Sequence, residues 1–181
     1  MSAFSTGNEL NDQKVYRKFA RTIPDHIDLS QAIFSYLNHK YDILNNQPYV
    51  AILVPTTRGG IQFASELTEY LAKRGIPHNQ IQAISIDRTG EGAAERIRTL
   101  EELRFRYIIV LGMDFTREGF DTLMEEAINL DLIGNEKNTW MFSQHLIDMD
   151  DDGHYPLGSP IISALEVRIV FNYFIAVDIE C

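Results

Sequence analysis

The chain has little cysteine, little positive charge and no long apolar run. Its 181 residues include one cysteine, Cys181, and 16 Lys and Arg against 26 Asp and Glu. A single cysteine excludes an internal disulfide, which favours a cytosolic protein without excluding an oxidising compartment. The net charge of -10 repels phosphate backbones, so we expect no nucleic-acid partner.

Signals for export and for membrane insertion are also missing. The first residues, MSAFSTGNELNDQK, carry neither the basic region nor the apolar core of a signal peptide. The longest late apolar run, 169–177, is interrupted by Asn172 and is too short to cross a bilayer about 30 Å thick. We therefore expect a soluble chain, long enough for one domain with its own core.

Strand-like and helix-like segments alternate through the middle of the chain. Short apolar runs predict buried strands, and apolar residues three or four apart predict amphipathic helices. The predicted strands are 50–54, 81–86, 107–112 and 139–143, and helices are predicted at 27–39, between the first two strands, at 92–103 and at 116–130. This order predicts an α/β fold, a three-layer αβα sandwich with a mainly parallel, doubly wound, flavodoxin-like sheet. Residues 160–180 are expected to form a helix and then a strand.

In two predicted helices, apolar residues spaced three or four positions apart define the face expected to pack against the core. Between the first two strands the apolar side chains recur at helical spacing, and Gly75 is expected to end that helix. The residues expected to face the core are Ile61, Ala64, Leu67 and Leu71 in the first of these helices, and Ile97, Leu100 and Leu103 in the helix at 92–103.

Ligands of open α/β sheets bind beyond the carboxyl ends of the strands. The segment after the first strand, TTRGG at 56–60, matches neither phosphate-binding fingerprint, yet a helix start beside Arg58 suits an anionic or carboxylate group. The alternative is that the glycines only allow close packing and that Arg58 is solvated. Reading the same edge after every strand gives the candidate ligand-binding residues Thr56, Thr57, Arg58, Gly59, Asp87, Met113, Asp114 and Gln144.

Asp114 has a second interpretation as a chemical centre. It follows a strand as the phospho-acceptor of a receiver domain does, but the acidic pair and the lysine of that chemistry are absent from the corresponding places. A capping aspartate ahead of the helix at 116 is the favoured reading. No G-x-S-x-G elbow is present, so we expect no enzyme. A flavodoxin-like receiver or metal-dependent enzyme working at Asp114 is the alternative function.

The acidic stretch DMDDDG, 148–153, matches the first half of a calcium-binding loop. Asp148, Asp150 and Asp152 stand at alternate positions, where carboxylates converge on one hard cation. Ser159 stands where the bidentate glutamate belongs, and Pro156 falls inside the loop. A solvated acidic loop is the alternative, and no other cofactor is expected.

Three stretches together resemble a known family: LNDQKVYRKFARTIPDHIDLSQAIFSYL, YVAILVPTTRGGIQFASEL and FRYIIVLGMDFTREGFDTLMEEAINLDLIGNEKNTWMFSQ. Their order and spacing resemble the ligand-binding region of the type 1 periplasmic-binding-protein superfamily. The similarity is greatest to its receptor branch, with metabotropic glutamate, GABA-B-type and natriuretic peptide receptors and branched-chain amino-acid binding proteins. The family fold has two α/β lobes that close on a ligand, and this chain resembles the second lobe alone.

The resemblance implies a domain organisation. The whole chain, 1–181, would be one lobe, in which 1–26 enters from a missing first lobe, 27–145 forms the αβα core and 146–181 is an acidic loop with a return segment. It implies an extracellular or periplasmic location, with the membrane reached only through a parent receptor. An exposed partner-facing surface also leads us to expect some self-association.

The resemblance further implies a function and a ligand set. The function is non-catalytic sensing of a small molecule, such as an amino acid or related carboxylate, by lobe closure. Ser5 and Thr6 match the family's hydroxyl pair for a ligand carboxylate. Thr56 stands in place of an aromatic that stacks on the ligand, and Gln144 in place of the acid that binds an ammonium group, so an α-amino-acid ligand is disfavoured.

Overall fold

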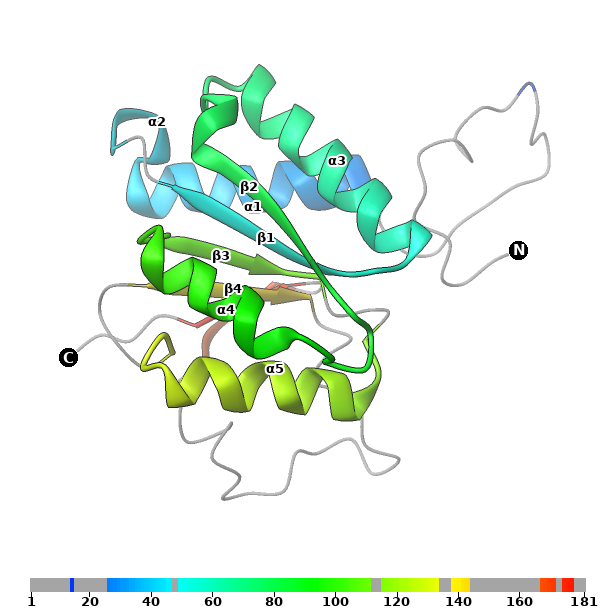
Figure 1. Cartoon of the computed structure of the whole chain (residues 1–181). Helices are drawn as coiled ribbons and strands as arrows, with labels where there is room; N and C mark the ends of the chain where they lie inside the picture. The colour runs from blue at the N-terminus through cyan, green and yellow to red at the C-terminus, as the bar shows by residue number, and fades with distance from the viewer. Residues whose placement is uncertain are drawn as a thin grey trace.

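The computed structural model describes Lys14 and residues 26–46, 49–111, 115–133 and 138–143, and the backbone of 167–171 and 174–177. Helices and strands alternate along most of this length (Figure 1). The elements are α1 (His26–Tyr41), α2 (Ile43–Asn46), β1 (Val50–Pro55), α3 (Arg58–Lys73), the short 3-10 helix η2 (His78–Gln80), β2 (Ile81–Ile86), α4 (Ala93–Glu102), β3 (Tyr107–Val110), α5 (Arg117–Asn129), β4 (Thr139–Ser143), β5 (Val167–Phe171) and β6 (Phe174–Val177).

One six-stranded sheet organises the fold, in the order β2-β1-β3-β4-β6-β5. The first four strands along the chain pair in parallel, with Val50 beside Ile81 on one side and beside Tyr107 on the other. β6 pairs antiparallel with both β4 and β5. The prediction of a mainly parallel α/β sheet is confirmed. Of the helix and single strand expected at 160–180, the described part, 167–171 and 174–177, forms two paired strands in place of one.

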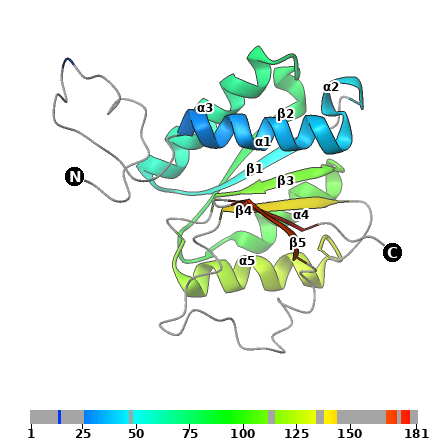
Figure 2. The same ribbon diagram turned by 180° about the vertical axis from the view of Figure 1, so that it is seen from behind.

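Helices cover both faces of the sheet, as in a three-layer αβα sandwich (Figure 2). One apolar cluster joins α1 and α3 to one face, through side chains such as Ile33, Phe63 and Ile109. A second cluster joins α4 and α5 to the other face, through Ile97, Phe120 and Trp140. The central strand β1 is buried along its whole length, which explains why its sequence is continuously apolar instead of alternating.

Two residues predicted to face the core are exposed instead. Ile61 is 52% exposed because α3 turns Gly60, Phe63 and Leu67 inward, and Ile61 lies one position off that stripe. Leu103 is 48% exposed because α4 ends at Glu102, and the chain then turns to bury Phe105 in its place.

The end of α3 confirms the predicted glycine stop. Gly75 has a φ of 107° and directly follows the C-cap residue Arg74. Its amide donates to Ala72 O at 3.0 Å, and the amide of Ile76 donates to Leu71 O at 3.2 Å. These two bonds form a Schellman motif, in which glycine is favoured because it avoids the strain of a side chain.

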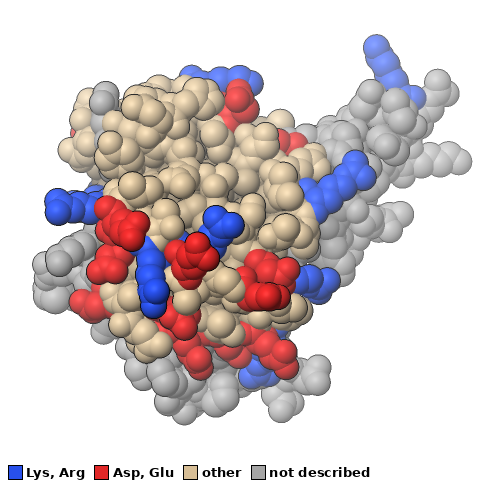
Figure 3. Space-filling view, in the orientation of Figure 1, with Lys and Arg blue, Asp and Glu red and all other residues tan. Residues whose placement is uncertain are grey.

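Charge is distributed unevenly over the surface. In Figure 3, acidic and basic residues gather over the lower part of the molecule, where α4 and α5 lie, whereas the upper part around α3 and β2 is mostly uncharged. Among the described residues, no helix combines the length and apolar composition needed to cross a bilayer.

Candidate functional site

The sheet changes its winding direction between β1 and β3. From β1 the chain passes through α3 to β2, over one face, and from β3 it passes through α5 to β4, over the other. β1 and β3 are neighbours, yet the helices that follow them, α3 and α5, pack on opposite faces of the sheet. In open α/β sheets such a switch point forms the ligand-binding crevice. The residues expected to bind ligand after β1 therefore lie beside this switch point.

Helices α3 and α5 begin with the same short pattern, T-R-x-G. Thr57 caps α3 by accepting a hydrogen bond from the Gly60 amide at 3.0 Å. Thr116 caps α5 by accepting from the Gly119 amide at 3.1 Å. The favoured reading of Asp114 as the cap of this helix is wrong, since the N-cap residue is Thr116. Threonine oxygens satisfy amides that the first helical turn leaves without partners.

The glycine in each pattern allows the first turn of its helix to pack directly against the backbone of another segment. A Cβ atom at Gly60 would lie 2.4 Å from Pro55 O, and one at Gly119 would lie 2.1 Å from Arg88 O. Contacts this short exclude any side chain without a shift of the backbone. Close packing, which the sequence left as an alternative for the glycines after β1, therefore applies to Gly60.

Hydrogen bonds join the loops at the carboxyl edge. The Thr56 amide and hydroxyl both donate to Ile86 O, at 2.8 and 3.0 Å, which links the loops after β1 and β2. The Thr116 amide and hydroxyl both donate to Arg88 O, at 2.9 and 3.1 Å, which links the loops after β2 and β3. The described hydrogen bonds of Thr56 therefore hold the ends of β1 and β2 together.

Asp87 organises the loop after β2. Its Oδ1 accepts from the Thr89 hydroxyl at 2.6 Å and from the Thr89 amide at 2.9 Å. These hydrogen bonds from Thr89, with a smaller contribution from the charge of Arg88, hold the pKa of Asp87 below its ordinary value. Asp87 is therefore ionised at neutral pH and serves to shape the loop.

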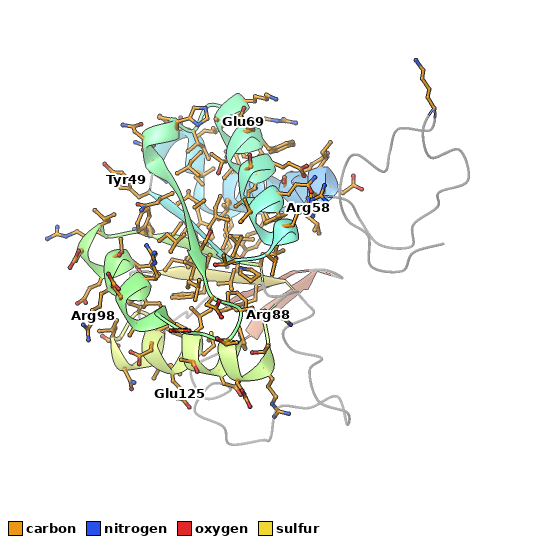
Figure 4. All side chains as sticks on the ribbon, turned by 45° about the vertical axis from the view of Figure 1, so that its right-hand side comes forward. Tyr49, Arg58, Glu69, Arg88, Arg98 and Glu125 are labelled. Carbon is orange, nitrogen blue, oxygen red and sulfur yellow. The ribbon has the colours of Figure 1, made fainter. Side chains whose placement is uncertain are left out.

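Two arginines extend from this edge. Arg58 is the first residue of α3 and Arg88 lies in the loop after β2, and both side chains are exposed. Figure 4 places them on the same side of the molecule, opposite Arg98 and Tyr49. Neither forms an ion pair with a described residue. Arg88 was not among the predicted site residues, because only its position beyond a strand marks it in the sequence.

Several predicted site residues lie outside the described part of the chain. They are Ser5, Thr6, Met113, Asp114, Gln144, Asp148, Asp150 and Asp152. Their expected roles, including the calcium loop, stay predictions. Within the described residues, no group of three or more His, Cys, Asp or Glu is placed to hold a metal ion.

A buried histidine braces the two helices on the α1–α3 face. His26, 3% exposed, has its Nδ1 atom 2.8 Å from Glu66 Oε2, and its ring packs edge-on against Phe63. Glu66 Oε1 accepts from Gln62 Nε2 at 2.9 Å. Sequence reasoning missed this contact, because nothing in the sequence links two residues forty positions apart.

A hollow of about 700 Å³ lies at the opposite, amino edge of the sheet, between the ends of α4 and α5. Leu132 O faces this region, but it already accepts from Trp140 Nε1 at 2.8 Å and from Asn138 Nδ2 at 3.2 Å. The winding of the sheet does not change there. The carboxyl edge therefore stays the candidate ligand site.

The model of the receptor family ligand-binding region matches residues 1–164, which is most of the chain. No curated protein matches the sequence.

Proposed function

The chain belongs to the receptor family ligand-binding region, and from that premise we propose that it is one lobe of a receptor domain that closes on a small anionic ligand. The family is generally a non-catalytic binding region. The ligand would lie at the carboxyl edge of the sheet, in the crevice between the loops after β1 and β3. Its class would be a small carboxylate or a related organic anion.

The observation that carries this proposal is that Arg58 and Arg88 lie on the same side of the molecule, beside an edge whose strand ends are joined by hydrogen bonds. The loops that hold them are joined through Thr56 and Ile86 O, so the two guanidinium groups stand on a fixed framework. Arginine stays protonated in proteins and offers a fork of donors that matches a carboxylate. The first amides of α3 add partial positive charge to the same edge.

The mechanism we propose is closure of two lobes around the ligand. A ligand that contacts both lobes binds the closed arrangement more tightly and shifts the population toward it. This lobe would supply the arginine wall, and the other lobe of the two-lobed family fold would supply the opposite wall. The location would be the extracellular or periplasmic face of a membrane receptor, where soluble ligands reach such a site.

A thermal-shift screen followed by calorimetry tests the proposal. The chain is screened against amino acids, small mono- and dicarboxylates and neutral sugars, and a ligand at a hundredfold excess over its Kd stabilises the native state by about 2.7 kcal/mol. The strongest hit is then titrated into wild type, Arg58→Ala, Arg88→Ala and the matched control Arg98→Ala. We expect carboxylates to bind and Arg58→Ala or Arg88→Ala to weaken them about tenfold, with Arg98→Ala unchanged.

Two results would overturn the proposal. One is preferential binding of neutral sugars over every anion. The other is an equal loss of affinity in all three arginine variants, because a general effect of net charge would then account for binding without a specific site.

A further inference from the structure

The free edge of β2 presents unused backbone groups. β2 is the outermost strand of the sheet and pairs only with β1 among the described strands. Ile86 O accepts the Thr56 amide, so the carbonyl of Ile86 points toward β1. Backbone direction alternates along a strand, so the N–H and C=O groups of Ala83 and Ser85 point away from β1, toward the edge.

The sequence of this edge strand lacks the usual protection against pairing. It reads IQAISI and contains no charged residue, no proline and no glycine. Exposed edge strands normally carry lysine, proline or a bulge, because unpaired backbone groups recruit another strand. An uncharged six-residue strand rich in β-branched residues instead has the composition of a strand that pairs.

Beside the edge lies a hollow with a protruding apolar side chain at its rim. It measures about 290 Å³ and is formed between α3 and β2, lined by Ile61, Ala64, Ser65, Thr68, Glu69, His78, Ala83 and Ser85. Half of the lining side chains are alanine or serine, and Ile61, which also lines the hollow, is 52% exposed. A surface that has both an exposed apolar side chain and a hollow that can receive one is self-complementary, as the interface of a two-fold dimer must be.

Charge supports the same conclusion. The chain carries a net charge of -10, which opposes contact between copies. The residues lining the hollow include one carboxylate, Glu69, and one histidine, His78, and are otherwise uncharged. Figure 3 shows the upper part of the molecule, around α3 and β2, as mostly uncharged. Two copies therefore meet here with less repulsion than over the charged surface of α4 and α5.

We propose that β2 pairs antiparallel with β2 of a second copy of this chain, so that the two sheets become one across a two-fold axis. The two-fold axis of this pairing is perpendicular to the sheet, so side chains on one face stay on that face in both copies. Residues opposite each other must then belong to the same face, and one residue pairs with its own counterpart at the axis. With Ala83 at the centre, its N–H donates to the Ala83 C=O of the other copy, and its C=O accepts from the Ala83 N–H of that copy. The Ser85 N–H then faces Ile81 O of the other copy. The two α3 helices then cover the seam, with Ile61 between them.

Sedimentation velocity of the full chain over a concentration series tests this pairing. The variants are Ile61→Lys on the seam, Ala83→Lys at its centre and Leu103→Lys as a control with similar exposure, 48%, outside the hollow. We expect a monomer–dimer equilibrium whose Kd rises at least about tenfold in Ile61→Lys and Ala83→Lys, since each change occurs twice per dimer. Leu103→Lys should match wild type. Circular dichroism and thermal melting confirm that each variant is folded.

A cross-link tests the register. In a Cys181→Ser background, Ala83→Cys brings two thiols together only when position 83 opposes itself, because opposite Cα atoms are then about 5.5 Å apart. We expect oxidation to give a covalent dimer, and the added Ile61→Lys change to abolish it. The proposal is overturned by a wild-type chain that stays monomeric at every concentration, by open-ended oligomers, or by equal dissociation in Leu103→Lys.

Discussion

Replacing Gly119 by alanine tests whether α5 is held against the loop after β2. The added Cβ would lie 2.1 Å from Arg88 O and 2.8 Å from the Arg88 carbonyl carbon. Both are backbone atoms, so no side-chain rotation relieves the contact. Either α5 or the loop must move, and Arg88 O is also the acceptor of the Thr116 amide and hydroxyl.

The expected cost combines three effects. Overpacking of a well-packed contact costs about 1–3 kcal/mol. Losing the two bonds to Arg88 O costs about 0.5–1.5 kcal/mol each. Alanine regains up to about 1 kcal/mol over glycine through its higher helix propensity. The free energy of unfolding should therefore fall by about 1–6 kcal/mol, which lowers the Tm of a chain of this length by about 2–4 °C for each kcal/mol.

Urea unfolding followed by circular dichroism measures this change. Glu118→Ala is the matched control, because Glu118 is exposed in the same helical turn and receives the same new side chain. The control should lie within about 0.5 kcal/mol of wild type. Equal stability of Gly119→Ala and Glu118→Ala would refute the close approach of α5 to this loop.

Three further predictions concern single side chains. Thr57→Ala should lower the free energy of unfolding by about 1 kcal/mol through loss of the α3 cap, and Thr57→Ser should restore most of it, both by urea unfolding. Asp87→Asn should be less stable than wild type at neutral pH. Because folding depresses the pKa of Asp87, the difference should persist above the ordinary carboxyl pKa of about 4 and vanish as pH falls through the depressed value, seen by unfolding at a series of pH values. Glu66→Ala should cost about 1–2 kcal/mol by removing the bond to buried His26, whereas Glu66→Gln, which keeps an acceptor, should cost less; equal thermal shifts would contradict this.

Local sequence patterns were enough to predict the core of the fold. Strands such as 81–86 and 139–143 were predicted at their exact bounds, because runs of apolar and β-branched residues end at clear turn residues. The glycine stop at Gly75 was also predicted, since glycine avoids the strain of its backbone conformation. Fold class followed from the order of these segments alone.

The errors came from effects that act between segments. The phase of α3 is fixed by Gly60, which must approach Pro55, so Ile61 turns to solvent although it is apolar. Of the two strands at the end of the chain, β6 pairs with β4 across a gap in sequence and β5 pairs with β6, and such pairing leaves no periodic signal in a short apolar run.

The candidate site was predictable in position but not in its bonding. The rule that ligands bind beyond strand ends located Arg58 and Asp87 on one edge. It did not reveal that Thr56 and Thr116 tie neighbouring loops together, because their amides and hydroxyls donate to carbonyl oxygens of residues about thirty positions away. The position of Arg88 on the same side of the molecule as Arg58 likewise followed only from the three-dimensional arrangement.

The most direct test of the central claim is a map of ligand-induced amide shifts. The organic anion that stabilises the chain most is titrated into the ¹⁵N-labelled protein, and amide chemical shifts are followed by NMR. Binding at the carboxyl edge predicts the largest shifts at 56–60 and 87–89. Shifts concentrated instead around the hollow at the amino edge, at Glu101, Arg104 and Asp131, would contradict it.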